Sequence, residues 1–286
     1  MTSRTRGFRP PGGGGRGRTS PRPGARPGAR PGARPGTHGL ARWLSKFGLA
    51  SRTEAARLVA AGRVTVDGRP IRDPERRTDP ARERIAVDGR PIEPNRPIYL
   101  AMHKPAGILT TAFDPEGRPT VYEHLPKDLP AWVFPVGRLD ARTSGLLVFT
   151  NDTDLGEALT SERFHVPKRY EVKVKGRLEP AGIERLRAGV VLDDGYRTLP
   201  AACEVMEREP EAGPGTGRGS TWVALTIREG KNRQIRRMME ALGHEVVKLR
   251  RTRIGPLELG DLAYGAVRPL TRAEVRALKQ AAALAP

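Results

Sequence analysis

Cysteine is almost absent from this chain of 286 residues, since Cys203 is the only one. A single cysteine excludes disulfide bonds and cysteine-based metal sites within one chain. Long apolar runs are absent too, because no stretch of about 18 apolar residues could span a bilayer. The N-terminal segment also lacks the apolar core of a signal peptide. We therefore expect a cytoplasmic protein without a membrane-spanning segment.

Acidic residues are outnumbered, since 51 Lys and Arg stand against 32 Asp and Glu and give a net charge of +19. This excess favours an anionic partner, with nucleic acid the first candidate and a membrane surface the second. Residues 1–37 contain nine arginines, much Gly and Pro, and no acidic residue. Such a segment buries too little apolar surface to offset its ordering entropy. We expect a disordered tail that either tethers RNA through phosphates or only keeps the protein soluble.

Residues 38–96 are predicted to form a small domain of two short helices and two hairpins. The sequence Ser-Arg-Thr-Glu at 51–54 is typical of a capping box at the start of the second helix. The string Val-Asp-Gly-Arg-Pro-Ile occurs at 66–71 and again at 87–92, and Asp-Gly predicts a tight turn in each copy. Apolar residues recur at helical spacing in the first helix, at Leu40, Trp43, Leu44 and Phe47.

Residues 97–286 form the larger predicted domain, in which both strands and helices are expected. Two short apolar runs, 132–136 and 146–149, predict strands on either side of the polar segment that contains Asp140. A Gly- and Pro-rich loop is predicted at 208–220. Further strands are predicted at 98–102, 167–174, 200–207, 222–227 and 244–253, and helices at 151–161, 179–188, 233–242 and 271–284.

Asp140 is the candidate catalytic residue. It lies at a strand end, where a rigid sheet can present a carboxylate to a ligand. Because Arg138 and Arg142 flank it, Asp140 could equally cap a turn or form a structural ion pair. Tyr170 alternates with charged residues in its predicted strand and, on composition alone, is a core aromatic.

The sequence Gly-Arg-Leu-Asp at 137–140, followed by Thr-Ser-Gly-Leu-Leu at 143–147, resembles the catalytic motif of the pseudouridine synthases that modify ribosomal RNA. The similarity runs from His38 to Leu270 and is to the RsuA-type branch of these enzymes. Three more motifs carry it, namely Lys-Pro-Ala-Gly at 104–107, Lys-Arg-Tyr at 168–170 and the basic segment at 228–238. The helices and hairpins of residues 38–96 resemble the α-L RNA-binding domain, first seen in small-subunit ribosomal protein four.

This resemblance implies a catalytic α/β (α+β) fold around a central, mostly antiparallel mixed sheet, preceded by the RNA-binding domain. It implies that Asp140 is the reacting carboxylate, that Tyr170 packs against the target uracil, and that Lys231 pairs with Asp140. Leu249 would line the uracil pocket. We expect further substrate contacts from Arg138, Arg233 and Lys104. We expect RNA contacts from Arg42, Arg52, Arg57 and Arg63.

The implied reaction is the isomerisation of uridine to pseudouridine in ribosomal RNA of a bacterial cell. The target base must leave its stack, and one ionised carboxylate must act as a nucleophile or as a base on the sugar. No redox change or phosphoryl transfer occurs, so we expect no cofactor and no metal. The run Glu-Gly-Lys-Asn-Arg at 229–233 matches the large-subunit branch. We therefore predict a monomer that modifies large-subunit ribosomal RNA, with small-subunit RNA as the alternative.

Two other classes of protein share parts of this pattern. A non-catalytic RNA-binding factor in ribosome assembly would be expected to have lost Asp140, Tyr170 or Lys231, and all three are present. A glycosidase needs two carboxylates flanking the bond that it cleaves. Asp152 and Asp154 are near Asp140 in sequence, but a predicted strand separates them from it.

Overall fold

The computed structural model describes residues 38–80, 82–93, 96–207 and 219–284. The tail predicted at 1–37 and most of the loop predicted at 208–220 lie outside the described residues. Within the described ranges, no helix is both long enough and apolar enough to cross a membrane.

The first module consists of two helices and short antiparallel strands. Its elements are β1 (His38–Gly39), α1 (Leu40–Lys46), α2 (Arg52–Ala60), β2 (Val64–Val66), β3 (Arg69–Ile71), β4 (Arg77–Thr78), β5 (Ile85–Val87) and β6 (Arg90–Pro91). Strands β3, β2, β5 and β6 form one sheet in that order, and β1 pairs with β4. Leu40, Leu44 and Val59 are fully buried in its core.

The two predicted hairpins are both present. Asp67 and Gly68 have φ of 50° and 76°, and Asp88 and Gly89 repeat these values at 49° and 76°. Two consecutive residues with positive φ are what a two-residue hairpin turn requires, and Asp-Gly supplies them at little cost. The repeated sequence therefore encodes a repeated turn.

The capping box predicted at the start of α2 is only half formed. The Ser51 hydroxyl accepts a hydrogen bond from the Glu54 backbone N–H at 3.2 Å, as an N-cap should. The Glu54 carboxylate pairs with Arg57 at 3.4 Å instead of returning to Ser51. The charge of Arg57, one turn further along the helix, competes for it.

The second module is built on a nine-stranded mixed sheet. Its core order is β11-β12-β10-β13-β9-β7-β15, with β14 added to β13 and β8 to β9. Every pairing is antiparallel except the one between β9 and β13, which confirms the predicted fold class. The strands are β7 (Tyr99–Lys104), β8 (Phe134–Pro135), β9 (Ser144–Thr150), β10 (Lys168–Lys175), β11 (Ala202–Val205), β12 (Ser220–Ile227), β13 (Val246–Ile254), β14 (Leu257–Glu258) and β15 (Val267–Pro269).

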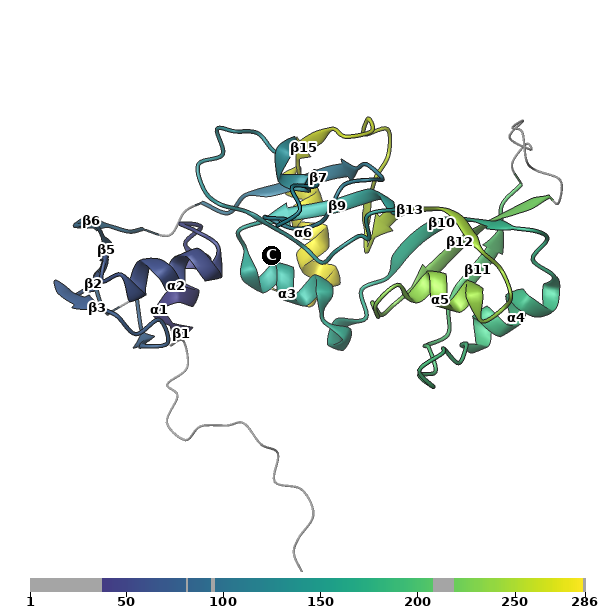
Figure 1. Ribbon diagram of the computed structural model, residues 1–286, viewed down its shortest axis with the longest axis horizontal. Helices are drawn as coiled ribbons and strands as arrows, with labels where there is room; N and C mark the ends of the chain where they lie inside the picture. Colours follow the sequence, from purple (N-terminus) through teal and green to yellow (C-terminus); the bar gives the residue numbers. More distant parts are fainter. Residues whose placement is uncertain (1–37, 81, 94–95, 208–218, 285–286) are drawn as a thin grey trace, which may run out of the picture. The chain divides into compact units, whose positions relative to one another are not determined.

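Helices cover the two halves of this sheet separately (Figure 1). They are α3 (Thr153–Thr160), α4 (Pro180–Ala188), α5 (Gln234–Glu240) and α6 (Arg272–Ala281), with short 3₁₀ segments η1 (Val121–His124) and η2 (Glu162–Phe164). Helices α3 and α6 pack on β9, where Leu155 and Leu278 share a core with Leu146. Helices α4 and α5 bury Leu186 and Met238 in the core that β10 and β12 line.

The two halves of the sheet join where β9 runs parallel to β13. This pairing is short, with Ser144 opposite Arg250 and Gly145 opposite Arg251. Gly145 has φ of 111°, and a Cβ atom at this position would collide with the backbone of Arg251. Glycine is therefore required for the close approach of the two strands.

Candidate active site

A cavity of about 360 Å³ opens beside this junction. Its walls come from the loop before β9, from β10 and β13, and from the segment that opens α5. A volume of this size is in the range of small-ligand sites. The residues predicted for the site that line it are Arg138, Asp140, Tyr170, Lys231, Arg233 and Leu249.

Asp140 lies in a loop that is tied to its surroundings through the backbone. Gly107 N–H donates to the carbonyl of Ala141 at 2.7 Å, and the Thr110 hydroxyl donates to the carbonyl of Leu139 at 2.8 Å. The Asp140 side chain itself is half-buried, and no hydrogen bond or ion pair holds its carboxylate within the described residues. The loop therefore fixes the backbone and leaves the carboxylate available to a ligand.

Lys104 does not line the cavity, contrary to its predicted contact with substrate. It is fully buried, and its ammonium donates to the carbonyls of Pro105 and Thr143 at 2.8 and 2.9 Å. Longer hydrogen bonds reach the carbonyls of Asp140 and Ala141 at 3.3 and 3.4 Å. Burial lowers the pKa of Lys104 to about 8, and the Asp140 carboxylate opposes this shift. Lys104 thus organises the Asp140 loop from behind.

Arg236, which the sequence analysis did not single out, supports the same loop from α5. Its guanidinium donates to the carbonyl of Arg142 at 3.1 Å and to that of Val246 at 3.2 Å. Burial lowers the pKa of Arg236, and the Asp140 carboxylate is the largest influence that opposes this shift. Arg236 also lines the cavity. The charge of Asp140 therefore affects the pKa of a cation on the cavity wall.

Lys231 has a different partner from the one the resemblance implies. Its ammonium forms an ion pair with Glu162 at 2.7 Å and lies 4.9 Å from the centre of the Tyr196 ring. The hydrogen bond that Lys231 donates to Glu162 raises the pKa of Lys231 above its ordinary value. Among the described residues, Lys231 makes no ion pair with Asp140, because Glu162 holds its ammonium.

The run at 229–233 is shaped by a buried carboxylate. Glu229 accepts hydrogen bonds from the Tyr196 hydroxyl at 2.6 Å and from the Leu199 N–H at 2.8 Å. The Gln234 amide donates to Glu229 at 2.5 Å and accepts from the Lys231 N–H at 3.0 Å. Arg233 has a left-handed backbone (φ 47°, ψ 30°) and an exposed side chain at the cavity. Glu229 therefore positions this turn and is not itself on the cavity wall.

Tyr170 and Leu249 form an apolar part of the wall. Both are buried, with 8% and 6% of their surface exposed. Tyr170 is paired with Arg251 across β10 and β13, and Leu249 is paired with Val172. The two side chains lie on the same face of neighbouring strands because residues two apart on a strand point the same way.

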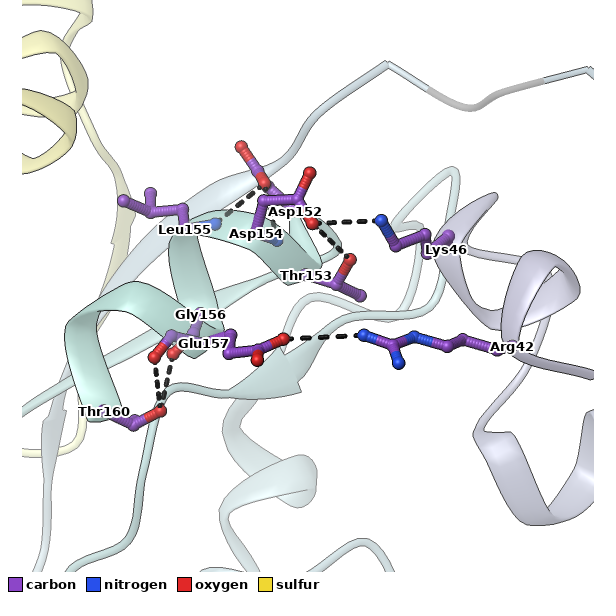
Figure 2. A network of polar contacts seen from close by, with 9 residues as sticks. All are labelled: Arg42, Lys46, Asp152, Thr153, Asp154, Leu155, Gly156, Glu157 and Thr160. Carbon is purple, nitrogen blue, oxygen red and sulfur yellow. Dashed lines mark hydrogen bonds and ion pairs between the residues drawn. The ribbon is translucent and has the colours of Figure 1, made fainter. Parts of the chain in front are cut away.

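The four arginines predicted to contact RNA differ in their partners. Arg42 pairs with Glu157 at 3.5 Å, and the neighbouring Lys46 pairs with Asp154 at 3.0 Å (Figure 2). Arg63 forms a two-pronged ion pair with Asp88, and Arg57 pairs with Glu54. Arg52 is exposed and has no acidic partner among the described residues. Of the four charges, that of Arg52 is the least compensated.

Asp140 is the one carboxylate among the described residues that line the cavity. The Asp152 side chain caps α3 and accepts a hydrogen bond from the Tyr99 hydroxyl at 2.8 Å. Asp154 is engaged with Lys46. Both candidates for the second carboxylate of a glycosidase are thus occupied with structural contacts, so the cavity does not fit that reaction.

Comparison with known families places both modules. Residues 98–241 match the family described as RNA pseudouridylate synthase, and residues 39–81 match the S4 domain family. A solved structure described as a pseudouridylate synthase is similar at a TM-score of 0.61 and 26% identity, and the match covers 84% of this chain and 99% of that one.

Two proteins of Bacillus subtilis (strain 168) are similar over nearly their whole length. An uncharacterized RNA pseudouridine synthase is 37% identical over 242 residues, which is 84% of this chain and 98% of that protein. Ribosomal large subunit pseudouridine synthase B is 35% identical over 240 residues, which is 84% of this chain and 95% of that protein.

Proposed function

Because the chain belongs to the RNA pseudouridylate synthase family, we propose that it isomerises one uridine of large-subunit ribosomal RNA to pseudouridine. The observation that carries this proposal is a single carboxylate, Asp140, on a cavity that also has an aromatic wall at Tyr170. The reaction needs one ionised carboxylate and a surface against which a base removed from its stack can pack.

The two modules have different roles in the proposed function. Residues 38–96 bind the RNA, and residues 97–286 carry out the reaction, while the nine arginines of residues 1–37 add positive charge. The S4 match at residues 39–81 supports the first assignment, and the synthase match at residues 98–241 supports the second. The net charge of +19 suits a polyanionic substrate.

Within the cavity, Asp140 reacts with the ribose, and the uracil packs against Tyr170 and Leu249. Arg236 positions the Asp140 loop, because its guanidinium donates to the carbonyl of Arg142 at 3.1 Å. Arg138 and Arg233 are exposed at the cavity and contact the phosphates on either side of the flipped nucleotide.

The large-subunit assignment rests on similarity in sequence. The Bacillus subtilis relative named as a ribosomal large subunit enzyme is matched over 95% of its length. The Glu-Gly-Lys-Asn-Arg run at 229–233 forms the turn that brings Lys231 and Arg233 to the cavity. Small-subunit RNA is the alternative substrate for the same enzyme.

The test is a map of pseudouridines in ribosomal RNA from a strain that lacks this protein. We expect one pseudouridine to be missing from the large subunit and to return with the wild-type gene. Asp140→Asn should not restore it, although this variant keeps the size of the side chain and should fold and bind RNA. Restoration by Asp140→Asn would contradict the role of the carboxylate. If the missing pseudouridine lies in small-subunit RNA, the substrate would be that RNA and the enzyme class would be unchanged.

A further inference from the structure

Two cations that line the cavity, one buried and one half-buried, have no acidic partner among the described residues. Arg251 on β13 is 3% exposed, and its Nε donates to the carbonyl of Leu146 at 2.8 Å. Its Nη2 is buried and has no hydrogen-bond partner among the described residues. Lys168 on β10 donates to the carbonyl of Val166 at 3.1 Å and forms no ion pair within the described part of the chain. Both residues lie on the cavity wall.

This arrangement is unfavourable unless a ligand completes it. Burial of a charge without a counter-charge has a large desolvation penalty, and a second cation nearby adds repulsion. Burial and the charge of Arg251 together lower the pKa of Lys168 to about 8. Buried polar groups without a partner are rare in native proteins, so the free Nη2 indicates an acceptor that is supplied by a ligand.

The position of the two cations indicates which part of a nucleotide they meet. Arg251 is paired with Tyr170 across the strands, and Lys168 lies two residues before Tyr170 on the same face. Both therefore flank the ring against which the uracil is proposed to pack. The phosphates belong to a continuous RNA chain and stay at the mouth, where exposed Arg138 and Arg233 lie. Oxygen atoms of the base are the acceptors that reach Lys168 and Arg251.

We propose that Lys168 and Arg251 donate hydrogen bonds to the carbonyl oxygens of the target uracil and stabilise the negative charge on the detached base. This inference rests on the proposed function. When the bond between C1′ and N1 breaks, its electron pair stays on the uracil and spreads to O2 and O4. The bond between C1′ and C5 then forms, the proton on C5 is lost, and N1 gains a proton. Atoms and charge balance without a co-reactant.

The pH dependence of the reaction separates Lys168 from its neighbours. The other charged groups on the wall are Arg138, Asp140, Lys231, Arg233, Arg236 and Arg251. Arginines stay charged throughout the accessible range, and the pKa of Lys231 is raised. Lys104, behind the Asp140 loop, has a pKa of about 8 like Lys168. Replacement of Lys168 by arginine leaves Lys104 in place and so tells the two lysines apart.

The experiment uses large-subunit ribosomal RNA transcribed with tritium at uracil C5, because the reaction releases that hydrogen to water. We expect the wild-type single-turnover rate to fall above about pH 8 as Lys168 loses its proton. Lys168→Met should lower the rate at pH 7 by about 10- to 100-fold, the usual effect of losing a hydrogen bond from a charged donor. Lys168→Arg should keep most of the rate and extend it to higher pH. Lys175→Met, at the exposed end of the same strand, is the matched control.

Three results would overturn the inference. One is a wild-type rate in Lys168→Met. Another is weaker RNA binding in Lys168→Met at an unchanged single-turnover rate, because the cation would then contact a phosphate. The third is a fall above pH 8 that persists in Lys168→Arg, which would assign the titration to Lys104. A wild-type protein that releases no tritium would overturn the proposed function, a result distinct from these three.

Discussion

At the scale of single residues, two cations hold the loop that carries Asp140, and neither forms an ion pair with its carboxylate. Lys104 and Arg236 each hydrogen-bond to carbonyls of the Asp140 loop, from behind and from the side of α5. The Asp140 carboxylate opposes the lowering of the pKa of both cations. The carboxylate itself lines the cavity and forms no hydrogen bond or ion pair within the described part of the chain.

Arg236 should therefore matter more to the reaction than Lys231. We expect Arg236→Met to lower the single-turnover rate by about 10- to 100-fold, because it removes a half-buried charged donor that holds the Asp140 loop. Lys231→Met should have a smaller effect, since Glu162 holds that ammonium. Single-turnover tritium release under saturating RNA measures both variants. Arg237→Met is the control, because its guanidinium pairs with Asp194 at 2.8 Å, away from the Asp140 loop. A larger loss in Lys231→Met would contradict this ranking.

Sequence patterns located most of the cavity but not the orientation of its lysines and arginines. Tyr170 and Leu249 reach it because strand periodicity decides which face a side chain takes, and Asp140 reaches it from the loop before β9. The sequence predicts a substrate contact for Lys104 because a lysine is rarely fully buried. Most of the carbonyls that surround its ammonium come from a distant part of the chain and become apparent only in the folded structure. Arg236 was missed because helical spacing groups it with exposed Arg233, although its long side chain reaches back to Arg142.

At the scale of elements, α6 illustrates a helix start that the sequence specifies completely. The Thr271 hydroxyl accepts from the Glu274 N–H at 3.2 Å, and the Glu274 carboxylate accepts from the Thr271 N–H at 2.8 Å. Arg268 donates to the same carboxylate at 2.6 and 2.9 Å. The Arg268 hydrogen bonds, with help from Thr271, hold the pKa of Glu274 at about 2.

The stabilisation from Glu274 should disappear in acid. Its folded-state pKa is lowered, so the carboxylate stabilises the protein above its ordinary pKa of 4.5 and stops doing so as the pH falls toward 2. We expect Glu274→Gln to lower the free energy of unfolding by about 1–2 kcal/mol at pH 7. The gap in melting temperature between variant and wild type should close between pH 4.5 and pH 2. Glu245→Gln, an exposed glutamate, is the control. A constant gap at every pH would show that charge plays no part.

The elements with strong periodicity or turn chemistry were predictable, and those that depend on tertiary pairing were not. The two Asp-Gly hairpins and the strands β10 and β12 follow directly from local sequence. The two-residue strands β4 and β14 carry no periodicity, because two residues cannot show alternation. The parallel pairing of β9 with β13 depends on the close approach at Gly145, which no local pattern reveals.

At the scale of the whole molecule, the excess of positive charge does not leave every basic side chain free to bind phosphate. The chain carries 51 Lys and Arg, yet Arg42, Arg57 and Arg63 of the first module each have a carboxylate partner. Exposed ion pairs contribute little to stability, but they reduce the local attraction for phosphate. Arg52, without such a partner among the described residues, remains the strongest candidate of the four for a phosphate contact.

Charge reversal at Arg52 should weaken RNA binding more than the same change at Arg63. A phosphate contact contributes about 0.7 to 0.9 to the slope of log K against log salt, so Arg52→Glu should flatten that slope by about this amount. Arg63→Glu should leave the slope nearly unchanged and instead repel Asp88 within its own module. Fluorescence anisotropy with labelled ribosomal RNA at several salt concentrations measures both. Equal slopes for Arg52→Glu and wild type would show that Arg52 contacts solvent and not a phosphate.

The short parallel pairing of β9 with β13 holds together the two sides of the cavity. Asp140 enters the cavity from the β7–β9 side of this junction, whereas Tyr170 and Leu249 enter from the β10–β13 side. A chain in which both half-sheets were folded but separated would keep almost all of its secondary structure and would lose the complete cavity. Secondary structure alone is therefore not enough to form the cavity, which requires the two half-sheets to be joined at this pairing.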